Sequence, residues 1–174
     1  RSVFDSTITV YHGSKVKFNR DQFHHSFLVG GYDQRGPGLY TTTDEGEATT
    51  YGQYLHTIRL DISKFVKINE RINRIIIQKL SKESPFIEDV ATDWDENTKI
   101  GINKAIEAAI KYSPNMHEAL ERVWYDIYRH DNEKFLENVQ YYDDGTTAKP
   151  NKFNSSTTHY IVWNPRAIKS IDIN

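Results

Sequence analysis

The spacing of apolar residues changes twice along this chain, and this pattern restricts the folds that the chain can adopt. Near both ends, apolar and polar residues alternate as in half-buried β-strands, in TITVYH, LHTIRLDI, THYIVWNP and IKSIDI. Between about residues 69 and 133 they recur at helical spacing. We therefore expect one α+β domain over residues 1–174, with a helical insertion over about 69–133.

Several finer expectations follow from local patterns. Ser113 and Pro114 form a good N-cap and first-turn pair for the third helical run. The segment EDVATDWDEN predicts an acidic surface loop, and TTAKPNKFNSST predicts a polar one. ENVQYYDDG predicts a strand that ends in an Asp–Gly turn. The helical runs are Ile72, Ile75, Ile76 and Leu80; then Ile102, Ala105, Ile106, Ala109 and Ile110; and then Leu120, Val123, Trp124, Ile127 and Tyr128.

Composition excludes several classes of protein. A net charge of -2 and a pI of about 6.4 argue against broad, charge-driven binding to nucleic acid or acidic membrane. The sequence contains no cysteine, so it has no disulfide, thiol nucleophile or cysteine zinc site. It also lacks H-E-x-x-H and G-x-S-x-G, and we expect no metal site. No apolar run approaches the roughly 18 residues of a membrane helix, so we expect no membrane partner.

The motif VYHGS places His12 at the end of a predicted strand, directly before Gly13. Taken alone, it is most simply a strand-end histidine followed by a turn glycine. A glycine at that position also lets a ligand approach the backbone closely.

A second motif, GPGLYTTTDEGEATTYG, spaces Tyr40 and Tyr51 eleven residues apart. If Tyr40 ends a strand and Tyr51 lies on the following helix, their rings can face one another and form a slot for a flat aromatic group. Stacking in such a slot contributes about 0.5–1.5 kcal/mol per ring beyond area burial. The alternative is that both are ordinary core tyrosines.

In this order, VYHGS, GPGLYTT, ATTYG and YLHTIRLDI resemble the ADP-ribosyltransferase fold of the diphtheria-toxin and poly(ADP-ribose) polymerase type. That family is known by a His, a Tyr and a Glu on three successive motifs, and it has a split β-sheet core. YIVWNPRAIKSIDI resembles the closing strands of bacterial and phage members. The resemblance covers roughly the first 65 and the last 40 residues and does not extend over the helical middle.

The resemblance implies that NAD is the co-substrate. His12 would then bond a ribose hydroxyl, the Gly13 backbone would pair with the nicotinamide amide, and Tyr40 and Tyr51 would clamp the nicotinamide ring. The loop over residues 19–35 would cover the dinucleotide. Lys15, Lys17 and Arg20 would lie near its phosphates, or simply form a solvated basic surface. The NAD-binding residues so implied are His12, Gly13, Ser14, Gly38, Tyr40, Thr41 and Tyr51.

One position departs from the family pattern. Where the polymerase-like strand has E-Y-I-V, this chain has HYIVW, with His159 in place of the Glu. In one interpretation Asp143 supplies the missing acid; Asp144, the natural turn residue, and Glu137 are weaker candidates. In a second, His159 is a substituted catalytic residue. In a third, the domain binds NAD and is inactive. The catalytic set predicted here is His12, Tyr51, Asp143 and His159.

The activity implied is mono-ADP-ribosyl transfer from NAD to a macromolecular acceptor, with release of nicotinamide. Protein is favoured over nucleic acid as the acceptor, because the chain is not basic. The family setting is a toxin, effector or phage-encoded modifier acting in the cytoplasm of a host or target cell, where an inhibitor or antitoxin protein is a further partner to consider. The alternative is an inactive NAD-binding or interaction module.

Overall fold

The fold is α+β, as the alternating and helical spacings predict. The computed structural model describes residues 6–17, 36–87, 96–149 and 156–174. In the helix α5, Glu96–Tyr112, it describes side chains only from Asn103 onward.

The chain divides into two compact units. The first combines Arg1–Leu28, Gly38–Val66 and Asp143–Asn174, and it holds the strands of the sheet. The second combines Val29–Pro37 and Lys67–Tyr142, and it holds the longer helices. The predicted insertion over about 69–133 therefore falls within the second unit, whose helices continue to Val139.

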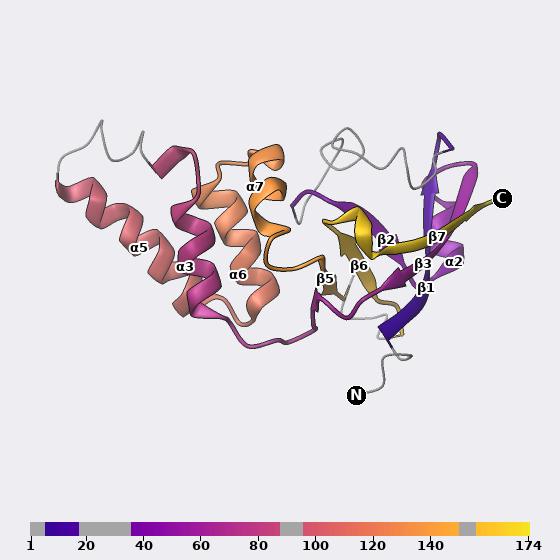
Figure 1. Cartoon of the computed structure of the whole chain (residues 1–174), viewed down its shortest axis with the longest axis horizontal. Coiled ribbons are helices and arrows are strands. Elements are labelled where there is room, and N and C mark those ends of the chain that lie inside the picture. Colours follow the sequence, from indigo (N-terminus) through magenta and orange to yellow (C-terminus); the bar gives the residue numbers. More distant parts are fainter. Residues whose placement is uncertain (1–5, 18–35, 88–95, 150–155) are drawn as a thin grey trace. The chain divides into compact units, whose positions relative to one another are not determined.

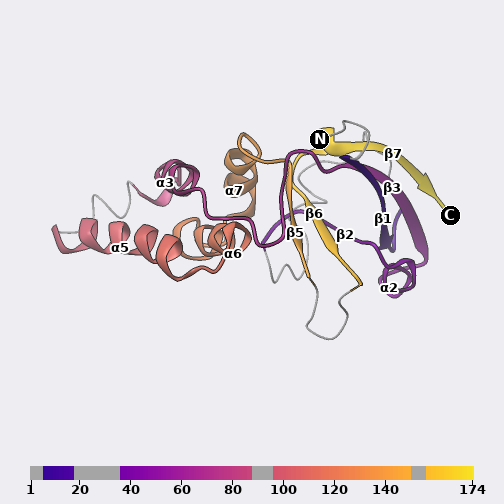
Figure 2. The ribbon, with the colours of Figure 1, turned by 90° about the horizontal axis from the view of Figure 1, so that it is seen from below.

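The described strands of the first unit form one seven-stranded sheet in the order β4-β5-β6-β2-β1-β3-β7. Figure 2 shows the strands following one another along an arc, with α2 near one end of β1 and β3. β4 and β5 are parallel, and the other neighbouring strands are antiparallel. The strands are β1 Thr7–Ser14, β2 Leu39–Thr42, β3 Tyr54–Asp61, β4 Phe65–Val66, β5 Gly145–Ala148, β6 His159–Val162 and β7 Ile168–Ile173.

The four alternating segments of the sequence lie in β1, β3, β6 and β7, so these predicted strands are confirmed. These strands carry apolar side chains that are buried completely. In the first unit these include Val10, Ile58, Leu60, Ile161 and Ile168.

The pairing on the two sides of β1 is unequal. β1 and β3 stay paired over their whole length, from Thr7 opposite Asp61 to Ser14 opposite Tyr54. Among the described residues, β1 and β2 share a single register position, at Tyr11 and Thr42. The two strands therefore separate at the end of β1 that carries the VYHGS motif.

The short helix α2, Glu45–Thr49, packs closely on β1 because two glycines leave room for it. A Cβ on Gly13 would lie 1.8 Å from the carbonyl oxygen of Ala48, and a Cβ on Gly52 would lie 2.2 Å from the carbonyl carbon of Ser14. The Asp44 side chain caps the helix by accepting a hydrogen bond from the Glu47 N–H at 3.2 Å.

The second unit is built from helices that lie beside one another (Figure 1). Many of their apolar side chains are buried. The third predicted run is buried throughout, and in the second run Ile106 and Ala109 are buried. In the first run Ile75 is exposed instead, and Ile77 and Leu80 form the buried face. The helices are α3 Arg74–Lys82, α5 Glu96–Tyr112, α6 Met116–Arg122, the π-helix η3 Val123–Ile127 and α7 Asn132–Val139; the first unit adds the 3-10 turn η4 Pro165–Ala167.

The prediction of a strand over ENVQYYDDG is wrong, because α7 continues through Val139. Phe135, Leu136 and Val139 are buried at helical spacing, whereas the strand reading relied on the β-forming residues at the segment's end. Gly145 begins β5 and is not a hairpin turn residue. Thr146 and Thr147, predicted as loop, are also in β5.

The predicted N-cap at Ser113 is also wrong, because α6 begins later. Asn115 is the N-cap and accepts the Glu118 N–H at 2.9 Å, while Ser113 Oγ is buried with no hydrogen-bond partner among the described residues. The side chain of Ile102, the loop over 19–35 and nearly all of EDVATDWDEN lie outside the described residues. No helix within the described part of the chain is long and apolar enough to cross a membrane.

The close packing of α2 on β1 predicts that Gly13→Ala is destabilising. The new methyl group would overlap the Ala48 carbonyl, so α2 would have to move, and we expect the free energy of unfolding to fall by about 2–3 kcal/mol. Gly46→Ala, within α2 itself, is the matched control: its Cβ would lie 3.3 Å from Asp44 Oδ1, so a small displacement of that side chain offsets the gain in helix propensity, and stability should change by less than about 1 kcal/mol in either direction. Urea denaturation measures both, and a Gly13→Ala protein as stable as the wild type would contradict this packing.

Candidate functional site

His12 lies where β1 and β2 separate, and its ring bridges the two strands. Nδ1 of His12 is 2.7 Å from the backbone oxygen of Tyr40. Because a carbonyl oxygen can only accept, Nδ1 carries the proton of the neutral ring and Nε2 carries the acceptor lone pair. Burial lowers the pKa of His12, and the nearby His56 lowers it further, although the bond to Tyr40 opposes the shift. His12 is therefore a neutral imidazole at neutral pH.

A second histidine, His56, supports His12 from β3. It is fully buried, its Nδ1 is 3.1 Å from the backbone oxygen of His12, and the two ring centroids are 5.8 Å apart. Burial also lowers the pKa of His56. His56 was not among the residues predicted from the sequence. Its burial could have been predicted from its position in LHTIRLDI, where it alternates in register with the buried residues Ile58 and Leu60.

Tyr51 lies beyond α2, and its expected place on that helix is wrong. The helix ends at Thr49, and the Tyr51 N–H donates to the Ala48 oxygen at 3.1 Å in the turn that follows. The residue is 62% exposed. A Cβ on Gly13 would lie 3.4 Å from Tyr51 Cβ, so the base of this side chain is against the backbone of β1. The backbone of Tyr40 thus contacts His12 from β2, and the base of the Tyr51 side chain lies against Gly13 from the turn after α2.

Three further residues of the predicted NAD-binding set have structural contacts of their own. Ser14 Oγ accepts the Val16 N–H at 3.1 Å. Thr41 is buried, and its hydroxyl donates to the Tyr160 oxygen at 2.7 Å. Gly38 has a φ of 137°, and a Cβ there would lie 2.5 Å from Ile161 Cγ2. Gly38 and Thr41 therefore fix β2 against β6.

The basic residues near the site are exposed where the structure describes them. Lys15 and Lys17 follow β1, and the Lys17 ammonium lies 5.1 Å from the centroid of the Tyr54 ring. Arg20 lies outside the described residues. No group of three or more His, Asp or Glu side chains in the described ranges is arranged to hold a metal ion.

Asp144 forms an ion pair that fixes the start of β5. Its Oδ1 accepts from Arg166 Nε at 2.8 Å, and its side chain is only 8% exposed. Its N–H donates to the Lys64 oxygen at 2.8 Å, and its own backbone oxygen accepts from Trp163 and Asn164. These contacts give Asp144 a structural role at the junction of β4, β5 and β6.

The structure does not bring Asp143 and His159 together. Gly145 pairs with Val162 and Ala148 pairs with His159, so His159 lies at the opposite end of the β5–β6 pair from the two aspartates. Three residues of strand correspond to about 10 Å. Asp143 itself is half-buried. Glu137, the remaining candidate acid, is on α7 in the second unit and pairs with Lys134 at 3.3 Å.

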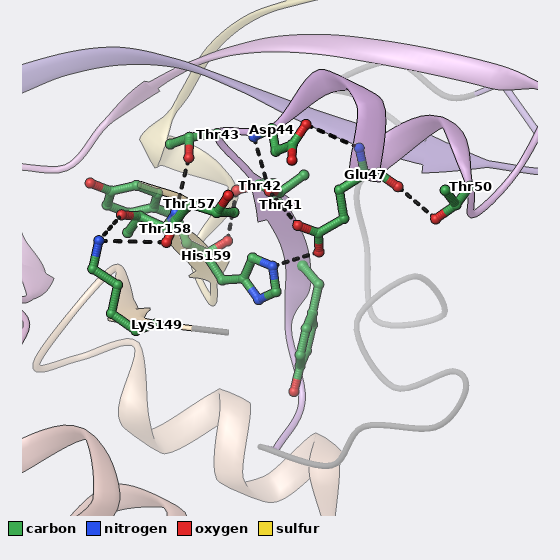
Figure 3. Close-up of polar contacts among 12 residues, drawn as sticks. Thr41, Thr42, Thr43, Asp44, Glu47, Thr50, Lys149, Thr157, Thr158 and His159 are labelled. Carbon is green, nitrogen blue, oxygen red and sulfur yellow. Dashed lines mark hydrogen bonds and ion pairs between the residues drawn. The ribbon is translucent and has the colours of Figure 1, made fainter. Parts of the chain in front are cut away.

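A different carboxylate, Glu47, lies beside His159 (Figure 3). Its Oε1 is 2.7 Å from Nε2 of His159, and its Oε2 accepts the Thr42 hydroxyl at 3.2 Å. Glu47 was not among the residues predicted from the sequence. It follows Asp44 by three residues as in a capping box, where the acid bonds the N-cap N–H. Here the Asp44 N–H instead donates to Thr42 Oγ1 at 3.1 Å, and the Glu47 carboxylate extends to β6.

The lowered pKa values of His12 and His56 predict a loss of stability on mild acidification. An unfolded chain titrates its histidines near pH 6.5, above their folded pKa values, so it takes up protons first. The contribution of the two histidines to the free energy of unfolding is therefore complete above about pH 6.5. It decreases as the pH is lowered from about 6.5 toward the folded pKa values. Urea denaturation between about pH 7.5 and 5.5 measures this, and His56→Gln should flatten the slope even though it lowers stability. A wild-type slope of zero would contradict neutral, buried rings.

The ion pair of Asp144 predicts a coupled loss of stability. Asp144→Asn removes the negative charge of the nearly buried carboxylate that accepts the hydrogen bond from Arg166. We expect the free energy of unfolding to fall by about 1–2 kcal/mol. Arg166→Gln should show a coupling with Asp144→Asn of at least about 0.5 kcal/mol in a double-mutant cycle by urea denaturation. Strictly additive effects would mean that the two side chains do not stabilise the fold together.

Comparison with known proteins gives little similarity. No protein-family model and no curated protein sequence matches this chain. A solved structure described as "Crystal structure of an anti-CRISPR protein" superposes with a TM-score of 0.41 and 14% sequence identity, over 97% of this chain and 96% of that one. A likeness at this level supports no conclusion about function.

Proposed function

We propose that this chain is a mono-ADP-ribosyltransferase that transfers ADP-ribose from NAD to a macromolecular acceptor and releases nicotinamide. The observation that carries the proposal is the meeting of three separate sequence motifs at one end of β1. His12 bonds the backbone of Tyr40, and Tyr51 Cβ lies against Gly13. These are the residues on which the resemblance to the ADP-ribosyltransferase family rests.

The sheet supports the same proposal. In that family the core sheet is split. Here β1 and β2 share one register position among the described residues and then separate beside His12. We therefore propose that the first unit is an ADP-ribosyltransferase-type core, with the helices of the second unit as an insertion.

The hydrogen bond of His12 gives it a defined role toward NAD. With the proton on Nδ1 held by the Tyr40 oxygen, Nε2 is an acceptor and can receive the hydrogen of a ribose hydroxyl. The lowered pKa keeps the ring neutral, and Nε2 without a proton, at neutral pH. Tyr51, with 62% of its surface exposed, and the half-buried Tyr40 then offer ring faces to the nicotinamide.

The reaction requires these residues to orient the nicotinamide ring and the ribose and to stabilise a developing positive charge. The bond between nicotinamide and the ribose carbon breaks, its electron pair leaves with the nicotinamide, and the sugar becomes oxocarbenium-like. The acceptor then bonds to that carbon and loses a proton to a base. Orientation of the ring and of the ribose lowers the barrier by reducing the entropy lost in reaching the transition state. A carboxylate near the sugar stabilises the positive charge.

For the acceptor, we propose a protein. A net charge of -2 provides no general attraction for phosphate backbones. The toxin, effector or phage setting, the host cytoplasm and an inhibitor protein remain proposals that follow from the resemblance.

The test is nicotinamide release from NAD, measured with and without cell lysate, together with transfer of label from labelled NAD to lysate protein. Tyr51→Ala should lower kcat/KM about tenfold, because one stacking face and its buried area are lost. Tyr112→Ala on α5 is the matched control, since Tyr112 is also 62% exposed, and it should leave release unchanged. NAD binding by calorimetry without release would instead indicate an inactive binding module. If the wild type shows neither binding nor release, the proposal fails.

A further inference from the structure

We propose that Glu47 supplies the carboxylate of the transfer reaction and that His159 positions it. This inference rests on the proposed function and assigns the one group that function still lacks. The acid is absent at the start of β6, where HYIVW has His159. The structure places a carboxylate oxygen 2.7 Å from that histidine, supplied by α2 instead of by the strand.

Both oxygens of Glu47 have defined partners. Oε1 accepts from His159 Nε2, and Oε2 accepts from Thr42 Oγ1 at 3.2 Å. Thr42 is buried and pairs with His159 across β2 and β6, so the two donors belong to one rigid register position. A carboxylate held in this way needs little reorganisation when charge develops beside it.

The strand register places the pair on the face of the sheet that carries Gly13 and Tyr40. His12, one residue before Gly13, is on the opposite face, with its ring at the gap between β1 and β2, where it bonds the Tyr40 backbone. Residues two apart on a strand, and residues directly opposite on neighbouring strands, share a face. Tyr40 and Thr42 therefore share a face of β2, and His159 shares it as the partner of Thr42. Tyr11 pairs with Thr42, so Gly13 lies on this face as well, where the Ala48 oxygen of α2 approaches it. Glu47 is thus on the same side as Gly13 and Tyr40.

The exposure of the pair is intermediate. The side chains of His159 and Glu47 are 20% and 25% exposed, respectively. A group buried completely could not reach a sugar, and a fully exposed pair would contribute little through its charge. Partial exposure beside the Tyr40 face allows a carboxylate oxygen to approach a bound ribose.

The chemical role can be stated as a balanced step. As the bond from the ribose carbon to nicotinamide breaks, its electron pair goes to the nicotinamide nitrogen, and the ribose carbon gains positive charge next to Glu47. The acceptor oxygen or nitrogen bonds to that carbon, and its proton passes to the Glu47 carboxylate. Nothing is oxidised or reduced.

The rival explanation is structural: the ion pair would merely fix α2 to β6. The decisive variants are Glu47→Gln, which keeps the shape but removes the charge, and Glu45→Gln, its matched control. Glu45 lies on the first turn of the same helix and is exposed, so its replacement removes the same charge near the same helix end. A structural role predicts a loss of melting temperature in Glu47→Gln with kcat kept. A catalytic role predicts the loss of kcat.

The experiment measures kcat and KM for NAD by nicotinamide release from the full chain, with melting temperature and NAD binding alongside. We expect Glu47→Gln to lower kcat about 100-fold with KM for NAD nearly unchanged, and Glu45→Gln to match the wild type. His159→Gln should lower kcat less than Glu47→Gln. The double variant should resemble Glu47→Gln alone, because a positioning residue has no effect once its carboxylate is gone.

Each outcome decides the proposal. Full kcat in folded Glu47→Gln overturns it but leaves the proposed function intact, and a loss of kcat in Asp143→Asn alone would place the acid on Asp143. If Glu47→Gln does not fold, Glu47→Asp decides, since the shortened carboxylate should fold and lose about tenfold in kcat; full kcat there overturns the proposal. No nicotinamide release from the wild type, with or without lysate, overturns the proposed function and this role with it.

Discussion

The rest of the first unit depends on the contact between the backbone of α2 and the backbone of β1. Gly13 and Gly52 have no side chains, and the Ala48 carbonyl and the Ser14 backbone occupy the spaces where Cβ atoms would be. A helix that lies this close to a strand has little freedom to shift or rotate. Two side chains of the proposed site, Glu47 within the helix and Tyr51 just after its end, are therefore held close to His159 and to Gly13, respectively. The glycine of VYHGS thus has a packing reason inside the protein itself.

The local patterns were sufficient to predict the elements that carry most of the site. Strands with one inward face must alternate, and β1, β3, β6 and β7 do so clearly. His12 lies on a predicted strand for that reason, whereas the four-residue strand β2, which carries Tyr40, was not predicted from an alternating pattern. α7 was not predicted because it has only eight residues and is followed by tyrosines and a turn. In so short a segment, helical spacing of the apolar residues cannot be distinguished from the alternation of a strand.

The pairing of Glu47 with His159 was beyond the reach of the sequence, because the two residues are 112 positions apart. Local chemistry assigned Glu47 to its own helix, as the acid of a capping box. Only the register of β2 with β6, which places Thr42 opposite His159, draws that carboxylate away from the helix start. The wrong strand prediction for the segment that contains Asp143 has the same origin. That segment was assigned a strand end near the site, and the actual β5 begins after it and runs toward His159 from the opposite end.

The strand order has a further consequence, for the time at which the site forms during synthesis. β6, which comes late in the sequence, lies between β5 and β2. The centre of the sheet is therefore complete only when residues 159–162 are in place. The helical segment Lys67–Tyr142 leaves the ribosome earlier and has its own buried core. Pairings between such distant segments form slowly, and domains that can fold early generally do so. A nascent chain of this protein can therefore fold these helices before β6 has been synthesised, and the pair of Glu47 and His159 forms only after that strand has left the ribosome.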